Sequence, residues 1–142
     1  MKVSSLTDAD IAGVIALWRR CGLVRPWNDP EADIRLARSG NNADVLVGHD
    51  GDSIVASVLV GHDGHRGWVY YVSVDPDHQR RDFGRAIMTA AENWLRARGI
   101  EKLQLMVRGD NTRVKAFYES IGFGEQERVI YAKWLDGREL TP

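Results

Sequence analysis

The stretch Trp68–Arg98 constrains the fold of this chain more than any other part of it. Its first part, Trp68–Val74, consists mainly of β-branched and aromatic residues, which is the composition of a half-buried strand. Asp75-Pro76 ends that strand, because proline has no N–H to donate and a fixed φ. Apolar side chains then recur at helical spacing over Ala86–Arg98. The stretch therefore predicts a strand, a loop and a helix, in that order.

The loop between this strand and this helix is basic. It carries Arg80, Arg81 and Arg85 to the start of the helix, where the first N–H groups lack intrahelical partners and the helix dipole is positive. Such a place stabilises a bound anion. The loop therefore predicts a site for a phosphate or a pyrophosphate group.

Length and composition predict a single domain over residues 1–142, because 44% of its 142 residues are hydrophobic and can form one core. The formal net charge of -1 argues against a mainly electrostatic nucleic-acid binder. The only cysteine, Cys21, excludes an internal disulfide. The start of the chain lacks the apolar region of a signal peptide, and no stretch reaches the roughly 20 apolar residues of a membrane span. We therefore expect a cytoplasmic protein with no nucleic-acid or membrane partner.

Other patterns predict the remaining elements and the fold class. The predicted strands are Val3–Leu6, Ala43–His49, Ser53–Gly61, the strand Trp68–Val74 already described, Lys102–Val107, and a closing hairpin of Phe123–Gln126 and Val129–Trp134. Helices are predicted from Ile11 to near Cys21, over Pro30–Arg38 with Asp29 as N-cap, and after Asp110-Asn111-Thr112, which offers several possible caps, with Gly122 as the C′ residue. Hairpins combined with strand-helix-strand crossovers predict the α/β class (α+β by some schemes), with a mixed, mostly antiparallel central sheet and helices on both faces.

Two loops contain candidate binding residues. Arg25, Trp27 and Asn28 lie between the first two helices, where Trp27 either packs against the core or forms one wall of an acceptor pocket. The glycine-rich turn 61–67 contains His62, Asp63 and His65, which could suggest a metal site, but no cysteine or further histidine nearby completes a tetrahedral ligand set, so no metal site is expected. Its Gly61-x-x-Gly64 imitates the GXXG loop of a KH module, yet it lies between strands rather than helices.

A second chemical feature lies in the last helix. Tyr118 follows Asn111 by seven residues, which is about two turns along one face. A neutral phenol, with a pKa near 10, can donate a proton or a hydrogen bond to a departing thiolate, whose thiol has a pKa near 8.5. The alternative is that Tyr118 is a core residue of an amphipathic helix.

Both features together resemble those of a known family. Gln79-Arg80-Arg81-Asp82-Phe83-Gly84 is similar to the acetyl-CoA pyrophosphate loop of the GNAT N-acetyltransferase superfamily, Q/R-x-x-G-x-G/A. The stretch Asn111–Phe123 resembles the second signature of that family, N-x-x-A-x-x-x-Y-x-x-x-G-F. The resemblance covers nearly the whole chain, and residues 25–30 and 61–67 further resemble a bacterial YpeA-like branch.

The resemblance implies an N-acetyltransferase with acetyl-CoA as cosubstrate. A primary amine would attack the thioester directly in a ternary complex, and Tyr118 would act as general acid. The pantetheine arm would enter a gap between the Trp68 and Lys102 strands. The residues implied to contact the cofactor are Val72, Ser73, Val74, Gln79, Arg80, Arg81, Asp82, Phe83, Gly84, Arg85 and Asn111. Candidates for contact with a small-molecule or peptide amine are Arg25, Trp27, Asn28, Asp29 and His65.

Two departures from the family pattern leave questions open. The strand before Asp75 has no carboxylate, so three alternatives stay open for the base: a water chain, a carboxylate from elsewhere such as Asp29, or His65. Asp82 occupies the first glycine of the loop pattern. As an N-cap its carboxylate would occupy the N–H groups that a phosphate should meet; the alternative is that it points to solvent or pairs with an arginine. These departures also motivate a second hypothesis, an inactive acyl-CoA-binding or protein-interaction module. Strands near the C-terminus would allow a homodimer.

Overall fold

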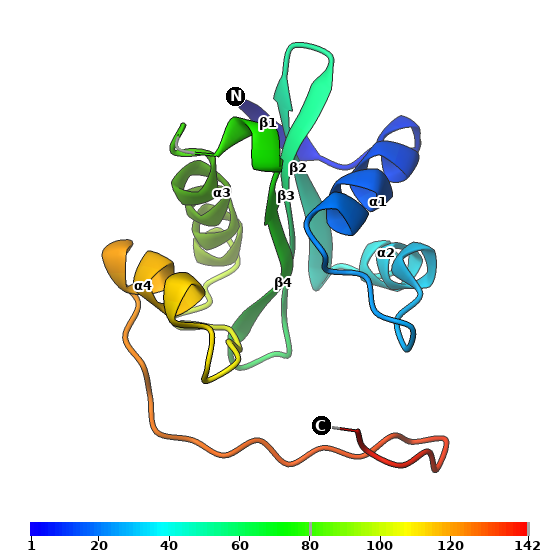
Figure 1. Ribbon diagram of the computed structural model, residues 1–142, viewed down its shortest axis with the longest axis vertical. Coiled ribbons are helices and arrows are strands. Elements are labelled where there is room, and N and C mark those ends of the chain that lie inside the picture. The colour runs from blue at the N-terminus through cyan, green and yellow to red at the C-terminus, as the bar shows by residue number, and fades with distance from the viewer. Residues whose placement is uncertain (80, 142) are drawn as a thin grey trace. The chain divides into compact units, whose positions relative to one another are not determined.

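The computed structural model describes residues 1–79 and 81–141 (Figure 1). The strands are β1 (Lys2–Ser5), β2 (Ala43–Asp50), β3 (Ser53–His62), β4 (Gly67–Val74) and β5 (Leu103–Gln104). The helices are α1 (Ile11–Arg20), α2 (Pro30–Arg38), α3 (Phe83–Arg96) and α4 (Thr112–Ser120), and two short 3₁₀ turns are η1 (Asp8–Asp10) and η2 (Pro76–His78). The chain divides into two compact units, Met1–Met106 and Val107–Pro142.

The first unit contains the five strands in the order β1-β2-β3-β4-β5. Neighbours from β1 to β4 pair in antiparallel fashion, whereas β4 and β5 are parallel and are joined through α3. Parallel neighbours need such a crossover connection. The predicted mixed, mostly antiparallel sheet is therefore confirmed.

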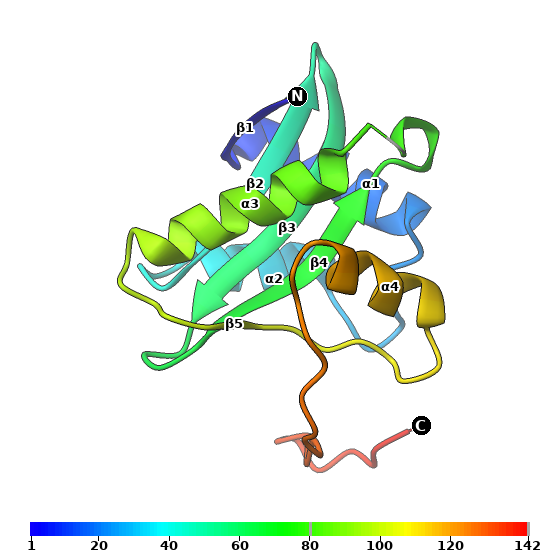
Figure 2. The ribbon, with the colours of Figure 1, turned by 90° about the vertical axis from the view of Figure 1, so that its left-hand side faces the viewer.

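Helices cover both faces of this sheet, as predicted. In Figure 1, α1 and α2 lie on one face and α3 on the other, and Figure 2 shows α3 crossing the middle strands. The core under α1 and α2 consists of Leu6, Val14, Trp18, Ile34, Ala37, Val45 and Val47. On the opposite face, α3 buries Ile87, Met88, Ala91 and Leu95. Each fully buried large apolar side chain contributes about 1.5–3 kcal/mol, so both helix layers are held firmly to the strands that they cover.

Helix α2 has the predicted bounds, because its start is specified locally. The Asp29 carboxylate accepts a hydrogen bond from the Ala32 N–H at 3.0 Å, and Pro30 occupies the first helical position. A side-chain cap satisfies one of the unpaired N–H groups, and proline there loses no bond. The residues before α2 are thereby fixed as a loop.

Two strand predictions were wrong, one in its extent and one altogether. The predicted strand Lys102–Val107 is a strand only at Leu103–Gln104, because β4 offers it only the partners Gly67 and Trp68. Strand character requires a neighbour as well as an alternating pattern.

The predicted closing hairpin, Phe123–Gln126 with Val129–Trp134, is absent from the described residues. Glu127-Arg128 between its halves carries no glycine or asparagine turn signal, and an isolated two-stranded hairpin is marginal in water. The side chains that would have been buried are exposed, with Val129 at 80% and Tyr131 at 93%.

The second unit contains α4, whose two ends agree with the prediction. The Asn111 side chain accepts a hydrogen bond from the Val114 N–H at 3.2 Å, and Gly122 follows with φ 102°. Lys115 and Glu125 form an ion pair of 3.2 Å in the same unit. None of the helices in the described residues has the length and apolarity needed to cross a membrane.

Candidate active site

Strand β4 has an open edge over most of its length. Its register with β5 consists of Gly67 opposite Leu103 and Trp68 opposite Gln104. From Val69 onward, no strand of the described residues pairs with β4 on that side. The other edge pairs with β3 as far as Val74. Main-chain groups of β4 beyond Trp68 are thus available to an extended ligand, which can add to such an edge as a strand does.

A β-bulge interrupts β4 within this open part. Ser73 lies opposite Ser57 and Tyr70 opposite Leu59, so two residues of β4 face the single Val58 between them. The first of the two, Tyr71, has φ +54°. A left-handed conformation costs a non-glycine residue about 1–2 kcal/mol, and a bulge bends and twists its strand. The bend agrees with the loss of pairing to β5.

The side chain of Tyr71 is held by both helices on its face. Its ring stacks on Trp18 of α1 with centroids 3.9 Å apart and an interplanar angle of 4°. Its hydroxyl donates to Asp33 Oδ2 of α2 at 2.7 Å. Burial, followed by the hydrogen bond to the Asp33 carboxylate, raises the pKa of Tyr71 far above its ordinary value. The sequence offered one overlooked signal: Tyr70-Tyr71 interrupts the alternation of the strand.

The loop that follows β4 is anchored at its start by Asp75, which is nearly buried. Its carboxylate accepts hydrogen bonds from the Asp77 N–H at 3.0 Å and from Arg20 Nη2 at 3.2 Å. His78 Nδ1 lies 3.5 Å away, at the limit of a hydrogen bond. The main-chain bond from Asp77, and then the charges of Arg20 and His78, lower the pKa of Asp75. Asp75 is therefore a weak base that holds the loop. No sequence pattern linked it to Arg20, 55 residues away.

Asp82 precedes α3 in a left-handed conformation, with φ 59° and ψ 18°. The expectation that its carboxylate caps the helix was wrong, because it makes no capping hydrogen bond and is exposed. A side-chain cap requires an extended backbone at this position. Asp82 instead has the backbone that a glycine adopts readily and that aspartate tolerates better than most residues. The first-turn N–H groups of Phe83, Gly84 and Arg85 are thus not occupied by this carboxylate.

The remaining predicted loop residues lie at the same end of the first unit. Arg81 forms an ion pair of 3.6 Å with Asp50 at the end of β2, and both are well exposed. Phe83 lies against His78 with ring centroids 6.4 Å apart, and Arg85 is exposed in the first turn of α3. Gln79 links η2 to the loop. Arg80, also predicted to contact the cofactor, lies outside the described residues.

The strand residues predicted to meet the cofactor are Val72, Ser73 and Val74. Ser73 is buried and its hydroxyl donates to the Ser57 carbonyl at 3.2 Å. The thiol of Cys21 donates to the Val74 carbonyl at 3.3 Å. The Ser73 hydroxyl and the Val74 carbonyl are therefore already engaged within the protein, so a ligand along this edge would use the other main-chain groups of the stretch.

The predicted acceptor loop joins α1 to α2. The side chain of Trp27 is 43% exposed and is not part of the buried core. Arg25 and Asp29 are exposed and Asn28 is half-buried. Asp29 already caps α2 through one carboxylate oxygen. The loop thus presents an aromatic ring, a cation and an anion to solvent.

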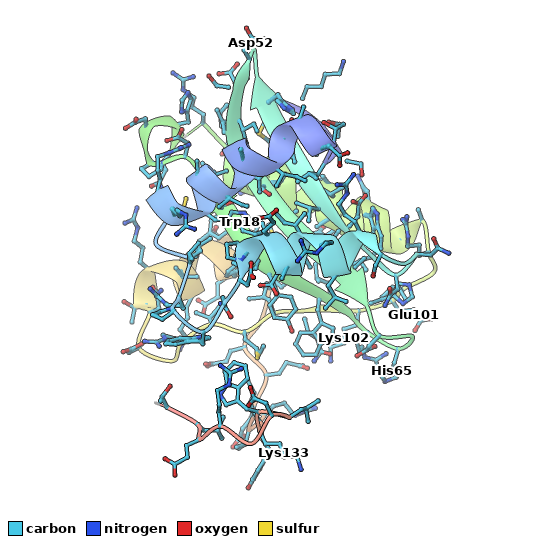
Figure 3. All side chains as sticks on the ribbon, turned by 90° about the vertical axis from the view of Figure 1, so that its right-hand side faces the viewer. Trp18, Asp52, His65, Glu101, Lys102 and Lys133 are labelled. Carbon is cyan, nitrogen blue, oxygen red and sulfur yellow. The ribbon has the colours of Figure 1, made fainter. Side chains whose placement is uncertain are left out.

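His65 lies at the other end of the first unit. Figure 3 shows it at the turn between β3 and β4, opposite the end marked by Asp52. At about 3.3 Å per residue, the eight-residue β4 is on the order of 26 Å long, so the structure separates His65 from the loop after Asp75. Asp63 accepts the N–H groups of His65 and Arg66 at 2.9 and 2.8 Å, which explains this turn. Among the described residues, no three His, Cys, Asp or Glu side chains lie close enough to hold a metal ion.

Tyr118 belongs to the second unit. Its ring makes edge contacts with Phe117 and Phe123, at centroid distances of 5.1 and 5.6 Å. Burial raises the pKa of Tyr118 to about 12. The phenol is therefore neutral throughout the physiological range and can donate a hydrogen bond or a proton. The amide oxygen of Asn111 is engaged in the cap of α4, which leaves its NH₂ group as the donor available to a ligand.

Comparisons with known proteins agree with this geometry. The model of the family described as acetyltransferase (GNAT) family matches residues 11–123. A Yersinia enterocolitica protein named acetyltransferase is 41% identical over 135 residues, which cover 95% of this chain and 96% of that protein. The ribosomal-protein-S18-alanine N-acetyltransferase from Escherichia coli has a TM-score of 0.74 and 26% identity, covering 96% of this chain and 86% of that one. AAC(6')-Iy, solved with the bisubstrate analogue CoA-S-monomethyl-acetylneamine, has a TM-score of 0.80 and 15% identity, covering 94% and 97%.

Proposed function

Because this chain belongs to the acetyltransferase (GNAT) family, we propose that it transfers the acetyl group of acetyl-CoA to a primary amine by direct attack in a ternary complex. It is an acyltransferase, and acetyl-CoA is its cosubstrate. The observation that carries the proposal is the open edge of β4, followed by the uncapped N-terminus of α3. An extended arm that ends in a pyrophosphate matches these two features in this order. We further propose that residues 1–142 act as one domain.

In this proposal the cofactor is held mainly by the main chain. The pantetheine arm pairs with Val72, Ser73 and Val74, because this stretch has lost its neighbour β5. The pyrophosphate binds the N–H groups from Arg80 to Arg85, where the dipole of α3 favours an anion. Arg80, Arg81 and Arg85 add positive charge, and Asn111 contributes its NH₂ group.

The chemical step forms a C–N bond and breaks the C–S bond. The neutral amine attacks the thioester carbon, the CoA thiolate leaves, and the amine proton passes to a base. Tyr118 donates to the departing sulfur. With a pKa of about 12 it is a weaker acid than a thiol of pKa about 8.5, so most of its effect is a hydrogen bond to the thiolate. Binding both reactants in one site supplies much of the remaining rate.

The acceptor is a small-molecule or peptide amine. AAC(6')-Iy was solved with an acetylneamine analogue, and the S18-alanine enzyme is named for a protein substrate, so both kinds of amine are represented among similar folds. Arg25, Trp27, Asn28 and Asp29 form the acceptor wall in this proposal, and a water chain or Asp29 removes the proton. His65 is a less suitable base, because it lies at the far end of β4. The likeness to the YpeA-like branch remains a sequence hypothesis.

Turnover with a panel of amines tests this proposal. We expect release of free CoA thiol from acetyl-CoA with at least one class among polyamines, aminoglycosides and peptides with a free N-terminus. The competing hypothesis is a module that binds acyl-CoA without catalysis. It is motivated by the lack of a free base near the strand: β4 itself contains no carboxylate, and Asp75, which directly follows it, is engaged by Arg20. Tight cofactor binding with no thiol release from any amine would favour that module.

A homodimer is a further proposal about the C-terminal segment. Residues 129–135 are mostly apolar or aromatic, and Val129, Tyr131 and Leu135 are highly exposed. Pairing this segment with a second copy would bury those side chains. Light scattering should then give twice the mass of one chain, and Tyr131→Glu should return it to the monomer mass. A monomeric wild-type chain would exclude the dimer.

A further inference from the structure

The strained backbone of Tyr71 is the starting point. Its φ of +54° is one of two positive values among the described non-glycine residues, and the other, Asp82, precedes α3. Aspartate tolerates this region, whereas a bulky aromatic residue rarely adopts it. Such a conformation persists only where the surroundings over-determine it.

Two helices supply that constraint. The Tyr71 ring is stacked on the fully buried Trp18 of α1, almost parallel to it. The Tyr71 hydroxyl donates to the Asp33 carboxylate of α2 at 2.7 Å. A hydrogen bond to a carboxylate is among the stronger ones that a protein makes. The tyrosine is therefore fixed at both the ring and the hydroxyl, and both contacts hold its side chain against α1 and α2.

The bulge decides which main-chain groups of β4 face the open edge. In a strand, successive residues direct their N–H and C=O groups to alternate edges. If β4 lost the bulge, it would have no extra residue opposite β3. Every residue of β4 after the bulge would then shift by one position relative to β3. The groups of Val72, Ser73 and Val74 that face the open edge would then turn toward β3. The conformation of Tyr71 therefore decides which edge of β4 these N–H and C=O groups face.

We propose that Trp18, Asp33 and Tyr71 form a clamp that holds the β4 bulge in the register that binds the pantetheine arm, which makes Asp33 and Tyr71 positioning residues for acetyl transfer. This inference rests on the proposed function, because it assumes that acetyl-CoA lies along β4. It assigns a role in the reaction to two side chains that do not contact the reacting atoms.

The clamp predicts that two ligands respond differently. Acetyl-CoA uses both β4 and the pyrophosphate loop, whereas ADP carries a pyrophosphate and no pantetheine arm. Tyr71→Phe keeps the stacked ring and removes only the bond to Asp33, and Asp33→Ala removes the same bond from the other side. Calorimetric titration, at a temperature at which circular dichroism shows each variant folded, measures both affinities.

We expect each variant to raise the Kd for acetyl-CoA about tenfold, or about 1.4 kcal/mol, and the Kd for ADP less than about twofold. The double variant should be no weaker than the single ones, because all three lack one and the same bond. Glu31→Ala is the matched control, since it removes a carboxylate from the same turn of α2 outside the clamp.

Each outcome is decisive. Unchanged acetyl-CoA affinity in folded Tyr71→Phe would overturn the clamp, and so would an equal loss of ADP and acetyl-CoA affinity, which indicates general damage to the fold. Equal weakening by Glu31→Ala would also overturn it, because charge alone would then explain the effect. A wild-type protein that binds no acetyl-CoA at millimolar concentration would refute the proposed function itself, and the clamp with it.

Discussion

Asp82 shows at the scale of one residue how a substitution in a glycine pattern is tolerated. Its φ of 59° is the conformation that a glycine supplies at no steric penalty. The aspartate keeps that conformation and does not cap the N–H groups of α3, but it places a negative charge beside the proposed position of the pyrophosphate. The sequence indicated the conflict correctly, but it pointed to the wrong mechanism, because capping depends on a backbone angle that residue identity does not determine.

Asp82→Gly should therefore tighten acetyl-CoA binding without loss of a cap. A like charge at about 4 Å costs on the order of 1 kcal/mol in water, which corresponds to about fivefold in Kd. Apo stability should change by less than about 1 kcal/mol, because relief of the left-handed strain opposes the greater freedom of glycine in the unfolded chain. Titrations at low and high salt measure the effect. Asp82→Asn, which removes only the charge, should match the glycine variant, and equal affinities of all three proteins at low salt would contradict the prediction.

Tyr118→Phe tests the proposed donor in the second unit. The ring and its contacts with Phe117 and Phe123 remain, so unfolding should change little, whereas kcat should fall by roughly 10²-fold. Because the pKa of Tyr118 is about 12, its ionisation should not reduce the wild-type rate below about pH 11. Steady-state rates across pH in both proteins provide the measurement. Full turnover by the variant would return Tyr118 to a packing role.

At the scale of elements, helices and strands that are specified by neighbouring residues were predicted correctly. Features that depend on residues far away in the sequence were not. The strand, loop and helix after Trp68 were predictable because proline, helical periodicity and glycine act within a few residues. Helix α2 was predictable because Asp29 and Pro30 define its start. The bulge in β4 was not predicted: Tyr70-Tyr71 interrupts the alternation of the strand, but the contacts that hold Tyr71 come from Trp18 and Asp33 on other elements. The closing hairpin failed for another reason. Its β-branched and aromatic residues favour a strand, but no neighbouring strand of the described residues and no turn residue supports it.

Asp75, which anchors the loop after β4, can be tested through the pH dependence of stability. Asp75→Asn should lower the free energy of unfolding by about 1–2 kcal/mol near neutral pH, because the charge-assisted hydrogen bonds of a nearly buried carboxylate are lost. The loss is not larger, because Arg20, the partner of Asp75, is half-exposed. The pKa of Asp75 is lowered in the folded state, so its contribution is full above the unfolded value of about 3.9 and is lost as pH falls through the lower folded value.

Urea unfolding near pH 6 and near pH 3 measures this dependence. The difference between wild type and Asp75→Asn should be largest at the higher pH and shrink at the lower one. Asp50→Asn is a suitable control, because it breaks an ion pair whose two side chains are about half-exposed and should change stability by less than about 0.5 kcal/mol. A difference that does not depend on pH would show that the carboxylate charge plays no part.

At the scale of the whole molecule, the cofactor should act on global stability, because it binds the folded chain and the unfolded chain has no site for it. At about 100 times its Kd, acetyl-CoA adds about 2.7 kcal/mol to the free energy of unfolding. For a domain of this size, each kcal/mol corresponds to roughly 3–5 °C in Tm, so Tm should rise by roughly 10 °C. Inorganic phosphate and pantetheine each supply only one part of the ligand, and they should raise Tm much less at the same concentration. If millimolar acetyl-CoA leaves Tm unchanged and produces no heat in calorimetry, then the open edge of β4 and the uncapped start of α3 do not form a cofactor site.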